Sequence, residues 1–264
     1  MKNKSKIIFN DISKIFNGIN RNSDVIALKN LSFSVEANEI FVIIGPSGCG
    51  KTTILNLIAG FIKPTGGAVL FDGEPITKPG KERTIIFQEY ALFPWYSVRN
   101  NIEFGLISKK LPFKERRLIS NELLQLIKME KFADLFPYQL SGGMKQRVAL
   151  ARALAVEPDV LLMDEPFGSL DAQTRGFLQL SLLNIWKARK ATIIFVTHSI
   201  DEAIILGQKI LVLSSQPGEQ RDCVEINKPF PRDLVRDQGL LDVKQRISKI
   251  LDEELNNYLK KTLE

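Results

Sequence analysis

EIFVIIGPSGCGKTTILNLIAG, residues 39–60, places an apolar run, a glycine-rich loop and a helical pattern in immediate succession. IFVII is continuously apolar, as a buried parallel strand is, and TTILNLIAG has the pattern of a helix with Gly60 as its C-cap. The loop GPSGCGKT at 45–52 fits GxxxxGK[ST] in the strand-to-helix context that this pattern requires. The stretch therefore predicts an α/β fold with a phosphate site at the end of this strand.

The residue types of this loop suit a triphosphate. Glycines let backbone N–H groups turn inward around phosphate oxygens, and the helix N-terminus adds about half a positive charge. Lys51 can reach the β- and γ-phosphates, and the Thr52 hydroxyl can hold Mg²⁺. Cys49 lies at the same helix N-terminus, which predicts a lowered thiol pKa, although a small filler residue is the simpler interpretation. The predicted nucleotide-binding residues of the loop are Gly45, Pro46, Ser47, Gly48, Cys49, Gly50, Lys51, Thr52 and Thr53.

Polar residues follow other buried strands, at the edge where open α/β sheets bind ligands. VLLMDE is an apolar strand that ends in Asp164, which suits Mg²⁺, and Glu165, which can face an attacking water. His198 is the only histidine and follows the strand TIIFVT, so we favour a γ-phosphate contact over a structural role. Gln88 ends the predicted strand TIIFQ on the same edge.

Patterning around these motifs divides the chain into regions. Residues 1–44 are predicted to form β-strands, and SFSV alternates as a half-exposed antiparallel strand does. Residues 89–140 contain no strand-like run and carry helical spacing, which predicts an inserted helical subdomain over about 89–158. Elsewhere strands alternate with helices, which predicts a mainly parallel sheet. The predicted strands are 84–88, 160–165, 192–197 and 209–213, and the helices are 143–156, 172–190 and 199–206.

The predicted fold is α/β: a phosphate-loop NTPase core with an N-terminal antiparallel β subdomain and the inserted helical subdomain. We place this domain over residues 1–215 and a C-terminal extension over 216–264. From Leu240 the extension has the apolar spacing of an amphipathic helix. Packing on the same chain is the favoured interpretation, and binding of a partner is the alternative.

A second glycine pair raises a question, because LSGGMKQR at 140–147 also opens a helix. Ser141, Gly142 and Gly143 form a second candidate anion cradle. The phosphate loop already encloses a triphosphate from one side. A single site in one chain therefore does not explain the second cradle.

Taken together, GPSGCGKT, Gln88, LSGGMKQR, VLLMDEP, GSLD and His198 resemble the nucleotide-binding subunit of an ABC transporter, over about residues 6–215. The resemblance implies an ATPase that uses ATP and Mg²⁺. Thr52, Gln88 and Asp164 would be the metal-binding residues. Glu165 would be the general base or water-positioning group and His198 the γ-phosphate contact. Gln88 would also sense a membrane partner.

The same resemblance implies a dimer with shared ATP sites, which would account for the second cradle. Ser141, Gly142 and Gly143 would serve the ATP held by a second copy, and Asp171 would lie at the dimer seam. Phe16 falls where the family commonly has a tyrosine stacked on adenine. An ordinary core position for Phe16 is the alternative.

A narrower resemblance is carried by FQEYALFPWYSVRNNIEFGL and VLSSQPG. Both are similar to the ATPase subunits of the nitrate/sulfonate/taurine (NitT/TauT) import group. This implies import of a small anionic solute through separate integral membrane permease subunits, with a solute-binding protein as an indirect partner. The aromatic residues of the first string either contact the membrane subunit or pack inside the chain. They are Tyr90, Phe93, Trp95 and Tyr96.

Three other functions stay open as alternatives. An exporter subunit is the closest of them. A soluble ABC ATPase acting on DNA or ribosomes is disfavoured, because the chain has one cassette and no sustained heptads. A non-enzymatic nucleotide-dependent module is disfavoured by the presence of Glu165 and His198.

Composition excludes several classes. The 264 residues are 44% hydrophobic and 25% charged, which is ordinary for a globular protein. The net charge of +6 is too small a surplus to indicate nucleic acid. Cys49 and Cys223 are far apart and form no disulfide framework, which favours a reducing cytosol. No signal peptide or membrane-length apolar run is present. We therefore expect a cytoplasmic protein, peripheral on the inner face of the membrane through a partner chain.

Overall fold

A mainly parallel sheet forms the centre of the computed structural model, which describes residues 5–18 and 24–263, residues 258–263 by their backbone alone. Among the described residues, six strands pair in the order β10-β9-β3-β8-β7-β6. The strands from β9 to β6 run parallel, and β10 is antiparallel to β9. The strands are β3 Ile40–Ile44, β6 Arg83–Ile86, β7 Val160–Asp164, β8 Thr192–Thr197, β9 Lys209–Leu213 and β10 Gln220–Glu225.

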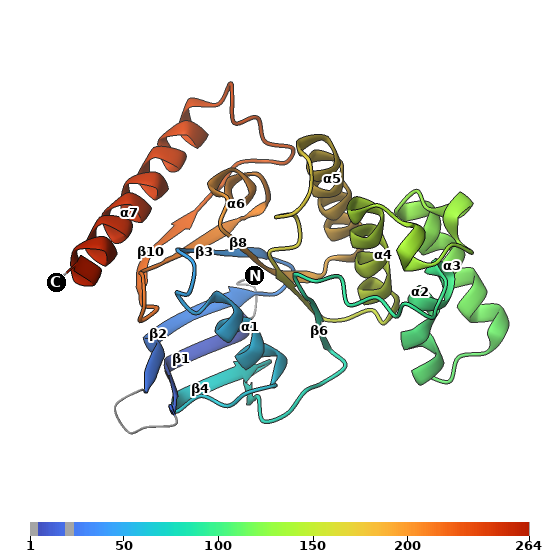
Figure 1. Cartoon of the computed structure of the whole chain (residues 1–264), viewed down its shortest axis with the longest axis horizontal. Helices are drawn as coiled ribbons and strands as arrows, with labels where there is room; N and C mark the ends of the chain where they lie inside the picture. The colour runs from blue at the N-terminus through green and yellow to red at the C-terminus, as the bar shows by residue number, and fades with distance from the viewer. Residues whose placement is uncertain (1–4, 19–23, 264) are drawn as a thin grey trace.

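A second, antiparallel sheet lies beside it at the N-terminal end of the chain (Figure 1). Its strands pair in the order β2-β1-β4-β5. This sheet confirms the predicted N-terminal antiparallel subdomain. The strands are β1 Ser5–Phe16, β2 Val25–Glu36, β4 Gly66–Phe71 and β5 Glu74–Pro75.

The chain between β6 and β7 forms a helical lobe at one side of the molecule (Figure 1). In this lobe α2 packs on both α3 and α4. It confirms the insertion predicted between two strands of the core. The helices are α1 Lys51–Ala59, α2 Val98–Ser108, α3 Phe113–Leu126, α4 Gly142–Ala155, α5 Ala172–Arg189, α6 Ile200–Leu206 and α7 Gln238–Leu263, with 3-10 turns at Glu130–Phe132 and Pro137–Gln139.

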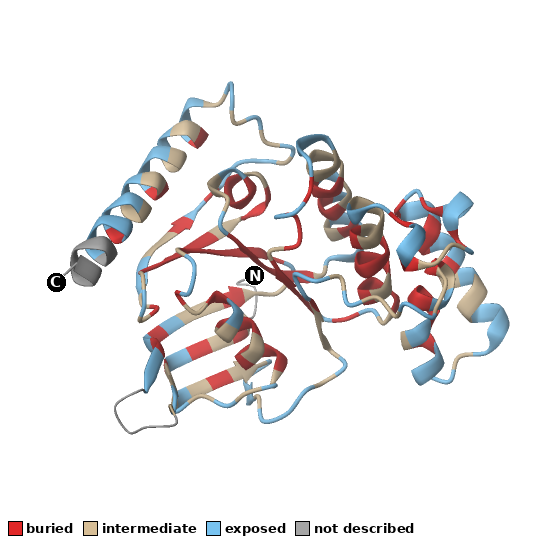
Figure 2. Cartoon of the chain, viewed as in Figure 1, coloured by how far each residue is buried: buried red, intermediate tan, exposed pale blue. Residues whose placement is uncertain are grey.

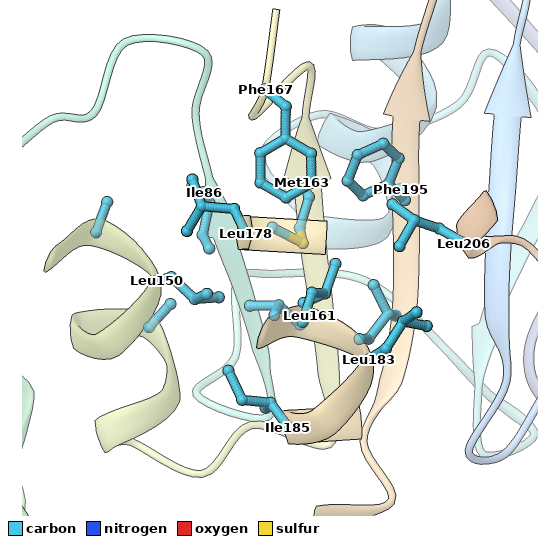
Figure 3. Close-up of a cluster of buried hydrophobic side chains, with 14 of the residues drawn as sticks. Ile86, Leu150, Leu161, Met163, Phe167, Leu178, Leu183, Ile185, Phe195 and Leu206 are labelled. Carbon is cyan, nitrogen blue, oxygen red and sulfur yellow. The ribbon is translucent and has the colours of Figure 1, made fainter. Parts of the chain in front are cut away.

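The hydrophobic core has two parts, one on each face of the parallel sheet. In β3, Ile40, Val42 and Ile44 face the part that contains α4 and α5, whereas Phe41 and Ile43 face α1 and the antiparallel sheet. This division follows from the alternation of side chains along a strand. Figure 3 shows the first part and Figure 2 shows the central strands buried along their length. Burial on both faces explains why these strands are continuously apolar in sequence.

The C-terminal extension contributes to the same fold in two ways. β10 pairs with β9, so the predicted domain boundary at residue 215 is corrected: the sheet continues beyond it. The sequence QRDCVE does not indicate a strand, because only Val224 of its six residues is buried. α7 packs on the chain itself, with Leu240 and Ile247 buried. None of the described helices is long and apolar enough to cross a membrane.

Candidate active site

The glycine-rich loop between β3 and α1 encloses the ammonium group of Lys51. Lys51 Nζ donates hydrogen bonds to the carbonyl oxygens of Gly45 and Pro46, both at 2.8 Å. The lysine is only 6% exposed. Gly48 and Gly50 have φ angles of 78° and 94°, the left-handed conformation that glycine adopts without steric cost. The loop is thus a concave backbone turn with a cation at its base, an arrangement suited to anions.

Two oxygen-bearing side chains meet beside this lysine. The Thr52 hydroxyl donates a hydrogen bond of 2.9 Å to Asp164 Oδ2 at the end of β7. Burial raises the pKa of Asp164, and the Thr52 hydrogen bond and the Lys51 charge offset part of that shift. Hydroxyl and carboxylate oxygens fit Mg²⁺, which takes few protein ligands and completes its shell with water and phosphate. No larger cluster of metal-binding side chains occurs in the part of the chain that the structure describes.

Glu165 connects the lysine to the histidine. Its Oε1 lies 3.9 Å from Lys51 Nζ, and its Oε2 lies 3.0 Å from His198 Nδ1. Glu165 adopts a φ of 44°, and its backbone N–H donates to Val196 O at 3.0 Å. The two consecutive acids therefore contact different partners: Asp164 contacts the Thr52 hydroxyl, and Glu165 contacts His198. The structure therefore brings Lys51, Asp164, Glu165 and His198 together from three separate motifs.

A buried network supports His198 from behind, and the motifs did not reveal it. Thr197 Oγ1 donates a 2.6 Å hydrogen bond to Glu202 Oε2, and the N–H of Ser199 donates to Thr197 Oγ1 at 3.0 Å. Burial raises the pKa of Glu202, while the Thr197 hydrogen bond and the Arg175 charge lower it. The spacing Ser199-x-x-Glu202 was a usable signal, since a serine three residues before a glutamate marks a helix start. The network fixes the turn that presents His198.

α7 closes the cleft in front of the phosphate loop. Residues 45–48 and His198 line a cleft of about 650 Å³ that also contains Leu251 and Leu255 of α7. Sequence analysis assigned α7 no part in the site, because its apolar spacing indicates only an amphipathic helix. The C-terminal extension therefore lies within reach of the candidate site.

Cys49 is a correction to the sequence prediction. Its side chain is fully buried. Burial raises the pKa of the Cys49 thiol, and the nearby Lys51 charge and backbone hydrogen bonds offset this only in part. The helix N-terminus does not lower the pKa as expected, because the sulfur points into the protein. Cys49 is an interior filler of the loop, which was the simpler interpretation.

Gln88 and Phe16 both lie at exposed positions. β6 ends at Ile86, so Gln88 lies in the following loop and not at a strand end, which corrects the prediction. Phe16 ends β1 and is 41% exposed, which contradicts the core alternative. Lys14 Nζ lies 5.0 Å from the centre of its ring. Phe16 therefore offers an exposed aromatic ring at the end of β1, an inner strand of the antiparallel sheet.

The second glycine pair is not among the residues that line the cleft at the phosphate loop. Ser141 is the N-cap of α4, and its hydroxyl accepts a long hydrogen bond of 3.4 Å from the N–H of Met144. Ser141 and Gly142 are exposed. At Gly143 an added Cβ would lie 2.5 Å from Thr174 Cγ2, so a larger residue does not fit. The start of α4 thus faces outward.

Asp171 lies close to this segment. It is the N-cap of α5, and its carboxylate accepts a 2.9 Å hydrogen bond from the N–H of Thr174. The hydrogen bonds from Thr174 lower the pKa of Asp171. Just before it, Ser169 shares a 3.0 Å hydrogen bond with the Tyr90 hydroxyl. The two predicted intersubunit segments are therefore adjacent on the surface of one chain.

The aromatic loop at 90–97 is half packed and half exposed. The Phe93 ring lies 4.5 Å from that of Phe104 and 5.7 Å from those of Trp95 and Tyr96, between ring centroids. Trp95 is nevertheless 68% exposed. Phe93 therefore packs within the chain, whereas contact of the exposed Trp95 with a membrane subunit stays a prediction.

Asn101 on α2 fixes the backbone of this loop. Its Nδ2 donates to the carbonyl oxygens of Phe93, Tyr96 and Ser97 at 3.0–3.2 Å, and its Oδ1 accepts from the N–H of Phe93 at 2.9 Å. The side chain is fully buried. A single asparagine in a helix carries no recognisable sequence signal, so this role could not be predicted.

Comparison with known proteins points to one family. The ABC transporter family model matches residues 28–168. An uncharacterized ABC transporter ATP-binding protein of Methanocaldococcus jannaschii is 46% identical over 257 residues, 97% of this chain and 95% of that protein. An aliphatic sulfonates import ATP-binding protein of Bacillus cereus is 45% identical over 226 residues, 86% of this chain and 88% of that protein.

Solved structures agree with the sequence matches. A dimeric ATP-binding cassette in a post-hydrolysis state, bound to ADP and Pi, superposes with a TM-score of 0.75. It is 31% identical in sequence, and the match covers 84% of this chain and all of that one. This similarity confirms the predicted fold class.

Proposed function

The chain belongs to the ABC transporter family as an ATP-binding and ATP-hydrolysing subunit, and from this premise we propose that it powers the import of a small organic anion. Its likeness to aliphatic sulfonates import proteins at 45% identity supports a sulfonate-type solute. Separate membrane permease subunits carry the solute, and a solute-binding protein delivers it to them. The chain binds these permeases from the cytoplasmic side of the membrane.

ATP binds with its phosphates in the loop 45–52. Lys51 donates to the β- and γ-phosphate oxygens, and the loop N–H groups contact the rest of the triphosphate. The contacts between Lys51 and the carbonyls of Gly45 and Pro46 support this role, since they hold the ammonium at the base of the cradle. Phe16 stacks on adenine, which its exposed ring supports.

Thr52, Asp164 and Gln88 are the residues that would hold Mg²⁺. When bound, the ion neutralises charge on the β- and γ-phosphate oxygens. The Thr52–Asp164 pair supports this proposal directly, because its two oxygens already adjoin. The assignment of Gln88 to the Mg²⁺ site is supported by the family resemblance and by its exposed position in the loop after β6.

Glu165 orients and deprotonates the attacking water, and His198 contacts the γ-phosphate. Hydrolysis is an in-line phosphoryl transfer, in which the protein mainly positions groups and stabilises charge. The contact of 3.0 Å between Glu165 and His198 supports the pairing of these roles, since each side chain holds the other in place.

Two copies complete the site. Ser141, Gly142 and Gly143 bind the γ-phosphate of the ATP held by the second copy, and Asp171 lies at the seam. The outward-facing start of α4 supports this, as does the dimeric state of the similar cassette. ATP draws the two copies together, and hydrolysis separates them. Trp95 and its exposed surroundings transmit this movement to the permeases.

The proposed hydrolysis rests on the contacts of Glu165 with Lys51 and His198. The variant Glu165→Gln tests it. The amide keeps the size of the side chain but cannot take a proton. We expect turnover to fall about 10²–10⁴-fold, with ATP affinity unchanged, measured by phosphate release and titration calorimetry. Glu157→Gln is the matched control, because that carboxylate is 75% exposed. Near-normal turnover in Glu165→Gln would refute the role of Glu165.

The solute class needs the assembled transporter. We expect an alkanesulfonate to stimulate the ATPase activity of the chain reconstituted with its permeases and solute-binding protein in vesicles. The matched alkyl alcohol, which lacks the anion, should leave the rate unchanged. Stimulation by both compounds or by neither would contradict a sulfonate-type solute, and the ATPase assignment would stand.

A further inference from the structure

The turn 214–218 between β9 and β10 is held in one conformation by its first residue. The Ser214 hydroxyl donates to Pro217 O at 2.7 Å and accepts from the N–H of Glu219 at 2.8 Å. The backbone N–H of Ser214 also donates to Glu219 O at 2.9 Å. Ser214 is 3% exposed, so these bonds are sheltered from water. The turn is therefore a rigid piece and not a loose connection.

This turn packs against both ends of the phosphate loop. An added Cβ at Gly45 would lie 3.1 Å from Leu213 Cβ, at the entrance to the turn. A Cβ at Gly218 would overlap the carbonyl oxygen of Cys49. The Gly218 N–H donates to Ala27 O at 2.9 Å, which ties the turn to β2. The turn thus forms a wall beside the loop, where Ser215 and Gln216 line the same cleft as residues 45–48, and a shift of the turn displaces the loop.

A buried carboxylate of α7 holds the turn from the other side. Glu254 Oε2 accepts from the N–H of Ser215 at 2.8 Å and from its hydroxyl at 3.1 Å. Glu254 Oε1 lies 2.6 Å from Arg221 Nε on β10. Glu254 is 4% exposed, whereas its neighbours Asp252 and Glu253 are exposed. Burying a carboxylate costs several kcal/mol unless its oxygens are paired, and here both are paired with this turn or its flanking strand.

We propose that Glu254 is a positioning residue for ATP binding: it fixes the turn 214–218 against the phosphate loop and so keeps the loop N–H groups in the arrangement that the phosphates require. This assigns a physical role to the VLSSQPG string and to α7. The proposal rests on the proposed function of the loop 45–52, since a loop that bound no phosphate would need no such support.

The test compares two ways of loosening α7 in the full-length chain. Glu254→Ala frees the turn. Arg246→Ala is the matched control, because it breaks an α7 contact with Asp222 at 2.7 Å and 2.8 Å without touching the turn. We expect Glu254→Ala to raise the KM for ATP about tenfold while kcat stays nearly constant, because weaker loop contacts reduce binding of the ground state and of the transition state alike. Arg246→Ala should leave the KM unchanged.

Two further variants keep the test decisive if Glu254→Ala folds poorly. Glu254→Gln retains an oxygen that can accept from Ser215, so it should recover most of the ATP affinity. Ser215→Ala removes the hydroxyl contact alone and should raise the KM about threefold, the effect of a hydrogen bond of ordinary strength. Melting temperatures are recorded for every variant.

Specific outcomes would overturn the proposal. A lower melting temperature with an unchanged KM in Glu254→Ala would make Glu254 purely structural. Equal rises in KM for Glu254→Ala and Arg246→Ala would assign the effect to general loosening of α7. Lys51→Ala separates this proposal from the proposed function. If Lys51→Ala loses ATP and Glu254→Ala does not, only the role of Glu254 fails; if Lys51→Ala binds ATP normally, the phosphate-loop assignment itself fails.

Discussion

The two glycine-containing segments, 45–50 and 141–143, have similar composition and opposite surroundings. The first encloses a buried lysine, whose ammonium donates to two loop carbonyls. The second has an exposed serine whose hydroxyl makes only a 3.4 Å capping bond. The first segment is completed by its own chain, while the second leaves its donors at the surface. Under the proposed function, these surroundings decide whether a segment of serine and glycine binds the phosphate of its own chain or that of a second copy.

Lys51→Ala should weaken ATP binding at the first segment and leave the second segment unaffected. Removing one partner of a buried, hydrogen-bonded charge contact costs about 2–5 kcal/mol, so we expect ATP affinity to fall by about 30- to 5,000-fold. Titration calorimetry on the single chain measures this. Circular dichroism should show an unchanged fold. Unaltered affinity would refute the role of the loop.

Ser141→Arg should disrupt the second segment and leave the first segment unaffected. ATP binding by the single chain should persist, whereas hydrolysis and ATP-driven dimerisation should fall roughly 100-fold, the effect of a misplaced charge at the centre of an interface. Light scattering in a Glu165→Gln background, with and without ATP, measures the dimer. A dimer of undiminished stability would contradict the shared-site interpretation of 141–143.

Asp164→Asn changes the carboxylate at the end of β7 that lies beside the first segment, and it tests the electrostatics there. Burial raises the pKa of Asp164, so its favourable contribution to stability is complete below its unfolded-state pKa and is lost as the pH rises through the folded-state pKa. The asparagine variant should therefore melt about 2–4 °C higher at neutral pH, a gain of roughly 1 kcal/mol.

The same variant should need more Mg²⁺ for hydrolysis, because an amide oxygen is a weaker ligand than a carboxylate. The difference in melting temperature should shrink as the pH falls through the raised folded-state pKa of Asp164, because the protonated carboxyl of the parent is then uncharged like the amide. Equal melting temperatures at neutral pH would show that the Thr52 and Lys51 contacts fully offset the cost of burial.

Labelling of Cys49 is expected to show the smallest effect of these tests. Its rate measures how accessible the interior of the phosphate loop is to a reagent. At pH 7.5, iodoacetamide should label the half-buried Cys223 several-fold faster than Cys49, because burial raises the pKa of both thiols but limits access mainly to Cys49. Peptide mass spectrometry measures both rates, and the unfolded chain should label both equally. Preferential labelling of Cys49 would restore the predicted activation by the helix N-terminus.

Much of the fold was predictable because a strand that is buried on both faces is continuously apolar in sequence. β8 and β9 lie where continuous apolar runs placed them. β10 was not predictable, because an edge strand with one buried residue has no such pattern. Polar groups at strand ends were also predictable as a set, since the ends of parallel strands share one edge of the sheet.

What could not be predicted is the support beneath the site. Glu254 lies in LDEEL, where three adjacent acids look alike, and only the tertiary fold shows that one of them is buried. The thiol pKa of Cys49 was mispredicted for the same reason, since its local position gave the helix terminus but not the direction of the sulfur, whereas the filler interpretation was right. Local sequence identifies the residues that perform chemistry better than those that hold them.

Asn101 has a mechanical consequence. Because its amide bonds the backbone at both Phe93 and Ser97, the loop around Trp95 and the helix α2 have little freedom to bend relative to each other. A displacement of the helical lobe is then transmitted to Trp95 with little deformation of the loop between them. A compliant loop would absorb the same displacement as internal strain. Under the proposed function, the efficiency of coupling at Trp95 would depend on the stiffness of this loop as well as on its affinity for the permease.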